Sequence, residues 1–129
     1  MKIEDALTAL KTSLHDLEGA SNYLLVFWSS DCGHCMNELP EVHAYISKHP
    51  EKGIKVIAIG LENGLQPWNE TIKLWPKFTH TIAESKWENS IPINYDINAT
   101  PSYFVLNTAK IITSKPYSLK DVKAVLDQK

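Results

Sequence analysis

The chain has 129 residues, of which 43% are hydrophobic and 22% are charged. This length is typical of one domain and can bury a core without disulfide bonds, so the chain is no disulfide-held miniprotein. The formal net charge is −2 and the basic residues form no run, which argues against nucleic acid or an anionic membrane surface as a partner.

The N-terminus and the apolar stretches give information on where the protein is located. No apolar stretch is long enough to span a bilayer, so we expect no transmembrane segment. The N-terminus carries Glu4 and Asp5 without a long apolar run, which is not the pattern of a signal peptide. We expect residues 1–129 to form a single domain, which is either a whole protein or one domain excised from a larger one.

The first half of the chain reads as a helix followed by a βαβ unit. Apolar residues at three- and four-residue spacing predict an amphipathic helix over 3–17. Continuous apolar runs predict buried strands over 23–29 and 54–60, joined by a helix over 35–49 that Pro40 should kink. Two strands joined by a helix should pair in parallel with a right-handed crossover.

The middle of the chain gives weaker signals. We expect a helix over 70–78 that ends near Pro76, an extended piece over 79–83, and a loop over 87–96.

The C-terminal third predicts a hairpin and a last helix. Strands are expected over 102–107 and 111–114, separated by a turn. Ser118 is a suitable cap for a helix over 119–128.

The chain has two cysteines, Cys32 and Cys35, which directly follow the first predicted strand and open the next helix. A helix N-terminus presents unpaired N–H groups and a partial positive charge, which stabilise a thiolate. We therefore expect Cys32 to be the exposed reactive thiol and Cys35, one turn later, to close a disulfide with it.

Two other uses of the cysteine pair compete with a redox couple. A zinc site needs four ligands, and the chain has no second Cys-x-x-Cys and no closely spaced pair among His15, His43, His49 and His80. We therefore expect no metal site. An inert structural disulfide is the other alternative.

Further residues around the cysteines match a known pattern. They are Trp28, then Cys32-Gly33-His34-Cys35, then Pro40, and the distant pair Thr100-Pro101 directly before a predicted strand. This pattern resembles the thioredoxin superfamily. The resemblance implies an α/β, thioredoxin-like fold with a central mixed β-sheet flanked by helices, in which Pro101 follows a cis bond and faces the disulfide.

Within the superfamily, the chain looks most like the TlpA/ResA group of bacterial thiol-disulfide oxidoreductases. The stretch FWSSDCGHCMNELPEV, the acidic Glu62 after the second strand, and the long segment 61–97 carry this likeness. It implies a periplasmic or envelope-facing location, with a cytoplasmic one still open. Two residues depart from common patterns: Val26 stands where thioredoxins bury an aspartate, and Asp31 should disfavour a thiolate at Cys32 by like-charge repulsion.

The resemblance implies a role for each site residue. Cys32 attacks a partner disulfide and Cys35 resolves the mixed disulfide. A partly protonated His34 would stabilise the thiolate and place the reduction potential between about −270 and about −180 mV. Glu62 is the candidate proton-handling group, and the alternative is that it is an exposed carboxylate in a loop. For His34, the alternative is that it is a solvent-exposed residue of a turn without a role in the reaction. The expected substrate-binding residues are Trp28, Gly33, Thr100 and Pro101.

The sequence therefore predicts a monomeric thiol-disulfide oxidoreductase, acting as a reductase of protein disulfides and recharged by an upstream thiol reductant. It needs no cofactor besides the Cys32–Cys35 pair. Two alternatives remain: a thiol peroxidase, for which Ser29 occupies the place of the usual threonine, and a metal-binding or redox-sensing module.

Overall fold

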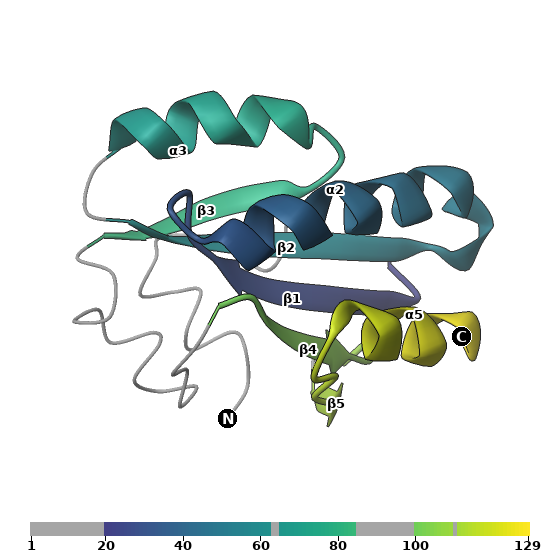
Figure 1. The fold of residues 1–129 in the computed structure, drawn as a ribbon. Coiled ribbons are helices and arrows are strands. Elements are labelled where there is room, and N and C mark those ends of the chain that lie inside the picture. The colour runs from purple at the N-terminus through teal and green to yellow at the C-terminus, as the bar shows by residue number, and fades with distance from the viewer. Residues whose placement is uncertain (1–19, 63–64, 85–99, 110) are drawn as a thin grey trace.

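The computed structural model describes residues 20–62, 65–84, 100–109 and 111–129. Within them, five strands form one mixed sheet in the order β3-β2-β1-β4-β5 (Figure 1). The strands are β1 (Asn22–Trp28), β2 (Ile54–Glu62), β3 (Thr79–Glu84), β4 (Ser102–Leu106) and β5 (Ile112–Ser114). β1 pairs in parallel with β2 and antiparallel with β4, and β3 extends the parallel side. The α/β fold with a mixed sheet is as predicted.

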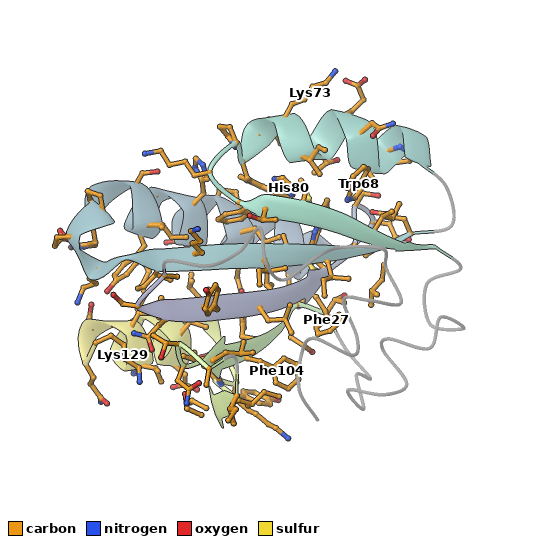
Figure 2. All side chains as sticks on the ribbon, turned by 180° about the vertical axis from the view of Figure 1, so that it is seen from behind. Phe27, Trp68, Lys73, His80, Phe104 and Lys129 are labelled. Carbon is orange, nitrogen blue, oxygen red and sulfur yellow. A yellow bond between two sulfur atoms is a disulfide. The ribbon has the colours of Figure 1, made fainter. Side chains whose placement is uncertain are left out.

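β1 lies at the centre of the sheet and is buried on both faces. Its alternate residues enter two separate core clusters, with Leu24 and Val26 in one and Leu25 and Phe27 in the other. This explains why the strand reads as a continuous apolar run rather than an alternating one. On the second face, the Phe27 and Phe104 rings meet edge to face, with centroids 5.9 Å apart (Figure 2).

Helices α2 (Gly33–Lys48) and α5 (Leu119–Asp127) pack against the face that carries Leu24 and Val26 (Figure 1). The inward residues are Leu39 and Val42 of α2 and Val122 and Leu126 of α5. α2 begins two residues earlier than predicted, because Cys32 itself caps it. It runs through Pro40, whose side chain is exposed.

The segment predicted as a helix over 70–78 is organised differently. The helix α3 spans Leu65–Thr71, and a 3-10 turn over Ile72–Leu74 ends the helical stretch. Pro67 lies in the first turn of α3, where a proline is tolerated. Trp75 leaves helical geometry, with φ −128° and ψ 68°, because the following Pro76 disfavours the helical region.

The remaining predictions divide into those confirmed and those not tested. The extended piece over 79–83, the C-terminal hairpin and the last helix are present, and Ser118 caps α5 by accepting a hydrogen bond from the Asp121 N–H. The helix predicted over 3–17 and the loop over 87–96 lie outside the described residues. No helix in the described ranges is long and apolar enough to cross a membrane.

Candidate functional site

The two cysteines form a disulfide at the junction between β1 and α2. Their Cα atoms are 5.2 Å apart. Cys32 is the N-cap residue of α2 and Cys35 lies in its first turn. Cys35 is completely buried, whereas Cys32 is half-buried. Cys32 is therefore the less buried of the two cysteines, and its role as the reactive thiol stays a prediction.

The Cys32 sulfur lies between two backbone groups of opposite polarity. The Cys35 N–H donates to Cys32 Sγ at 3.1 Å, in the position where a side-chain oxygen usually caps a helix. The Thr100 carbonyl oxygen lies 3.4 Å from the same sulfur, and the Thr100–Pro101 bond is cis, as the resemblance implied. An N–H aimed at the sulfur from a helix N-terminus favours a thiolate after reduction.

Trp28 lies beneath the motif, in the same core cluster as Cys35. Its side chain is fully buried and meets the Trp75 ring edge to face at 5.1 Å. Trp28 therefore supports the motif from inside and offers no surface to solvent. Val26, two residues earlier, is also fully buried, so an apolar side chain fills this part of the core.

Glu62 holds the loop that precedes Cys32. It is the last residue of β2, not a residue after the strand, and its side chain is 4% exposed. The carboxylate accepts hydrogen bonds from the Ser30 N–H at 2.7 Å and from the Ser30 hydroxyl at 3.0 Å. The alternative reading of Glu62 as an exposed loop carboxylate is therefore wrong.

The remaining motif residues face outward. His34, Gly33 and Asp31 are exposed, and the Asp31 carboxylate accepts a hydrogen bond from the buried Ser29 hydroxyl. His34 is exposed as its alternative reading expected, but it lies in the first turn of helix α2 and not in a loop turn. Its predicted action on the Cys32 thiolate stays a prediction.

A second carboxylate contact was not predicted from the sequence. The Tyr103 hydroxyl donates to Glu38 Oε1 at 2.8 Å, joining β4 to α2. Burial, together with this bond to Glu38, raises the pKa of Tyr103 well above its usual value. A tyrosine in the inward register of a strand signals that its hydroxyl needs a partner, but the sequence gives no means of naming Glu38.

Among the residues that the structure describes, no group of three or more histidine, cysteine, aspartate or glutamate side chains is placed to hold a metal ion.

Comparison with known proteins identifies the family. A family model described as thioredoxin-like matches residues 21–112. The chain belongs to the thioredoxin-like family. The sporulation thiol-disulfide oxidoreductase A of Bacillus subtilis is 30% identical over 87 residues, which are 65% of this chain and 52% of that protein. The thiol-disulfide oxidoreductase ResA of Oceanobacillus iheyensis is 30% identical over 61 residues, 47% of this chain and 31% of its own.

Solved structures extend the likeness over most of this thioredoxin-like chain. A domain of a possible thiol-disulfide isomerase from Cytophaga hutchinsonii superposes with a TM-score of 0.74 and 31% identity, covering 92% of this chain and 83% of that one. The family assignment made from Trp28, the Cys-Gly-His-Cys motif, Pro40 and Thr100-Pro101 is thus confirmed. The chain spans about half or less of the length of the two curated relatives.

Proposed function

We propose that this chain is a thiol-disulfide oxidoreductase that reduces disulfides of partner proteins through Cys32 and Cys35. The observation that carries the proposal is the half-buried Cys32 sulfur, which caps α2 and receives the Cys35 N–H at 3.1 Å. The names of the relatives in the thioredoxin-like family support the same class of reaction.

The reaction transfers two electrons and exchanges one disulfide for another. The Cys32 thiolate attacks a sulfur of the partner disulfide, and the other partner sulfur leaves as a thiolate that takes up a proton. Cys35 then loses its proton and attacks Cys32 Sγ, which breaks the mixed disulfide and releases the second partner sulfur. The chain is left with the Cys32–Cys35 disulfide, and an upstream thiol reductant restores the dithiol.

Partner recognition is proposed for the backbone beside Cys32. The Thr100 carbonyl oxygen lies next to the reactive sulfur, and Pro101 has no N–H of its own to compete for a partner backbone. Gly33 is exposed and leaves an approach to the sulfur open. Trp28 would contribute from below by supporting the motif.

Glu62 and His34 complete the proposal as proton-linked groups. Glu62 is buried at the end of β2 and contacts the loop that leads to Cys32, which suits a group that takes up the proton lost by Cys35. His34 is in the motif itself, where a positive charge would favour the reduced form.

Three further expectations belong to the proposal. The resemblance to the TlpA/ResA group is the basis for an envelope-facing location in a bacterium, and the chain length is the basis for a single domain over residues 1–129. A monomeric state is the third.

The reduction potential of the Cys32–Cys35 couple tests the proposed function. Equilibration against glutathione should give a reversible two-electron couple between about −270 and about −180 mV, and the reduced protein should reduce insulin as a probe disulfide. Cys32→Ser should abolish both. Absence of a reversible couple would overturn the proposal, as would peroxide consumption in place of disulfide reduction. Ser29, which occupies the place of the usual threonine of thiol peroxidases, is 5% exposed and donates its hydroxyl hydrogen bond to Asp31. This arrangement does not favour a peroxidase.

A further inference from the structure

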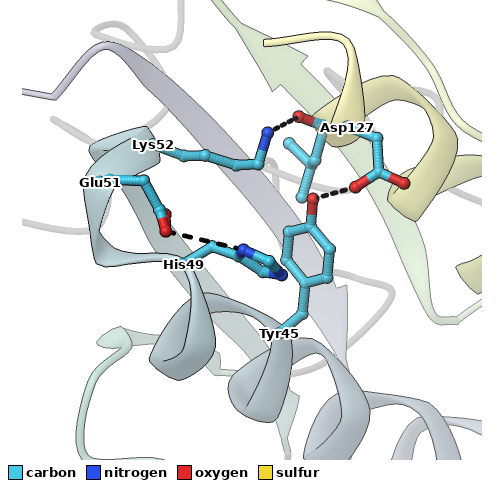
Figure 3. A network of polar contacts seen from close by, with 6 residues as sticks. Tyr45, His49, Glu51, Lys52 and Asp127 are labelled. Carbon is cyan, nitrogen blue, oxygen red and sulfur yellow. Dashed lines mark hydrogen bonds and ion pairs between the residues drawn. The ribbon is translucent and has the colours of Figure 1, made fainter.

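Helix α2 is tied to its neighbours by a tyrosine–carboxylate hydrogen bond near each end. Near its N-terminus, Glu38 accepts from Tyr103 of β4 at 2.8 Å. Near its C-terminus, Tyr45 donates to Asp127 of α5 (Figure 3). The two bonds have the same chemistry and share one helix, but only the first lies at the end that carries the cysteines.

The first bond links the two segments that meet at the reactive sulfur. Glu38 lies three residues after Cys35, and Tyr103 lies two residues after Pro101 on β4. The Thr100 carbonyl oxygen stands 3.4 Å from Cys32 Sγ. A strand advances ~3.3 Å per residue, so Tyr103 holds β4 only a short distance from the backbone that faces the sulfur.

The hydroxyl of Tyr103 is not needed to fill the core. The ring lies 2% exposed in a cluster with Val26, Val105 and Val122, where a phenylalanine ring would fill the same space. A buried hydroxyl is costly unless it finds a partner. Its hydrogen bond to the half-buried Glu38 therefore fixes the position of β4 relative to α2 and does not add apolar burial.

We propose that Glu38 and Tyr103 are a positioning pair that sets the Thr100–Pro101 backbone relative to Cys32 and so favours extended polypeptide disulfides as substrates. This inference rests on the proposed function. A polypeptide must place its backbone along Thr100 while its sulfur meets Cys32, so a small displacement between the two costs reactivity. A small disulfide needs only the Cys32 sulfur, and its reaction should not depend on this pair.

The test compares two substrates across matched variants. Single-turnover rates of the reduced protein are measured with insulin and with oxidised glutathione, together with the reduction potential. Tyr103→Phe and Glu38→Ala should lower the second-order rate constant for insulin about five- to tenfold, mainly by weakening the binding of insulin, and change the rate constant for glutathione less than twofold. Glu38→Gln keeps an oxygen that accepts from the hydroxyl and should stay near wild type.

Tyr45→Phe is the control, because it deletes the same hydroxyl at the other end of α2 and should change neither rate (Figure 3). Equal losses with both substrates, no loss in Tyr103→Phe, or the same loss in Tyr45→Phe would each overturn the inference. Should Glu38→Ala fail to fold, Tyr103→Phe decides alone, since it removes one oxygen atom. A wild-type protein that reacts with neither disulfide would instead overturn the proposed function, and the inference with it.

Discussion

Replacing Glu62 with alanine should destabilise the protein more than replacing it with glutamine. The alanine side chain removes both oxygens that bind Ser30, at 2.7 Å from its N–H and at 3.0 Å from its hydroxyl. The glutamine side chain keeps one oxygen for the N–H. Its amide NH₂ can donate to the Ser30 hydroxyl, which can accept as well as donate. The comparison therefore separates loss of the contacts from loss of the charge.

The size of each effect follows from the two contacts. Hydrogen bonds to a charged group contribute ~1.5–3 kcal/mol each, against ~1 kcal/mol for neutral ones. Ser30 is half-buried, so water can replace part of what is lost. We therefore expect Glu62→Ala to lower the free energy of unfolding by about 2–3 kcal/mol and Glu62→Gln by about 1 kcal/mol.

Urea unfolding of the oxidised proteins measures this difference. With a slope of ~2 kcal/mol per molar urea, the midpoint of Glu62→Ala should fall by about 1–1.5 M, and that of Glu62→Gln by about 0.5 M. An alanine variant within ~0.5 kcal/mol of wild type, the range of an ordinary surface substitution, would refute the loop-anchoring argument.

The same two variants address proton handling separately. If the carboxylate takes up the Cys35 proton, both variants should slow release of the mixed disulfide to a similar extent, because neither can accept a proton. If Glu62 only anchors the loop, Glu62→Gln should release the partner at nearly the wild-type rate. Stopped-flow measurement of mixed-disulfide decay distinguishes these results.

Three further substitutions or conditions test other parts of the structure. A Cβ on Gly60 would lie 2.6 Å from Trp68 Cδ1, so Gly60→Ala should destabilise by ~1–3 kcal/mol and shift the tryptophan fluorescence; an unchanged urea midpoint would contradict this. Burial lowers the pKa of His80, whose Nε2 lies 2.7 Å from the Trp75 carbonyl oxygen. The neutral His80 should stabilise the fold fully above about pH 6.5, and this stability should be lost as the pH falls below that value. If the free energy of unfolding of His80→Gln falls just as steeply over the same pH range, the prediction is wrong. Asp31→Asn should raise the reduction potential by no more than ~30 mV, since its charge is exposed and screened; a fall would show that Asp31 does not repel the thiolate.

The parts of the site that were predictable are carried by residues close together in sequence. The spacing of Cys32 and Cys35, the apolar run of β1 and the change to helical periodicity are all patterns of the continuous stretch 23–49. Local geometry converts these patterns directly into a capped helix after a buried strand. The cis bond before Pro101 was predicted instead from the family resemblance.

The contacts that complete the site join residues far apart in the chain. Ser30 and Glu62 are 32 positions apart, and Glu38 and Tyr103 are 65 apart. The apolar run that predicted the second strand ended at Gly60, and this placed Glu62 after the strand. β2 continues to Glu62 because β3 pairs with it there, beyond the end of β1. Which strand lies alongside is a property of the sheet that a charge in the sequence does not show.

The surroundings of Cys32 act on different atoms, and this makes their effects separable. The Cys35 N–H contacts the sulfur itself, so changes to the start of α2 should appear in the reduction potential. Glu62 contacts the preceding loop at Ser30, so substitutions of Glu62 should first lower the free energy of unfolding. Glu38 and Tyr103 join α2 to β4, so substitutions of these residues should change the rate with protein disulfides relative to the rate with small disulfides. A site held by one shared network would instead show all three effects in every variant, because the members of a network are not additive.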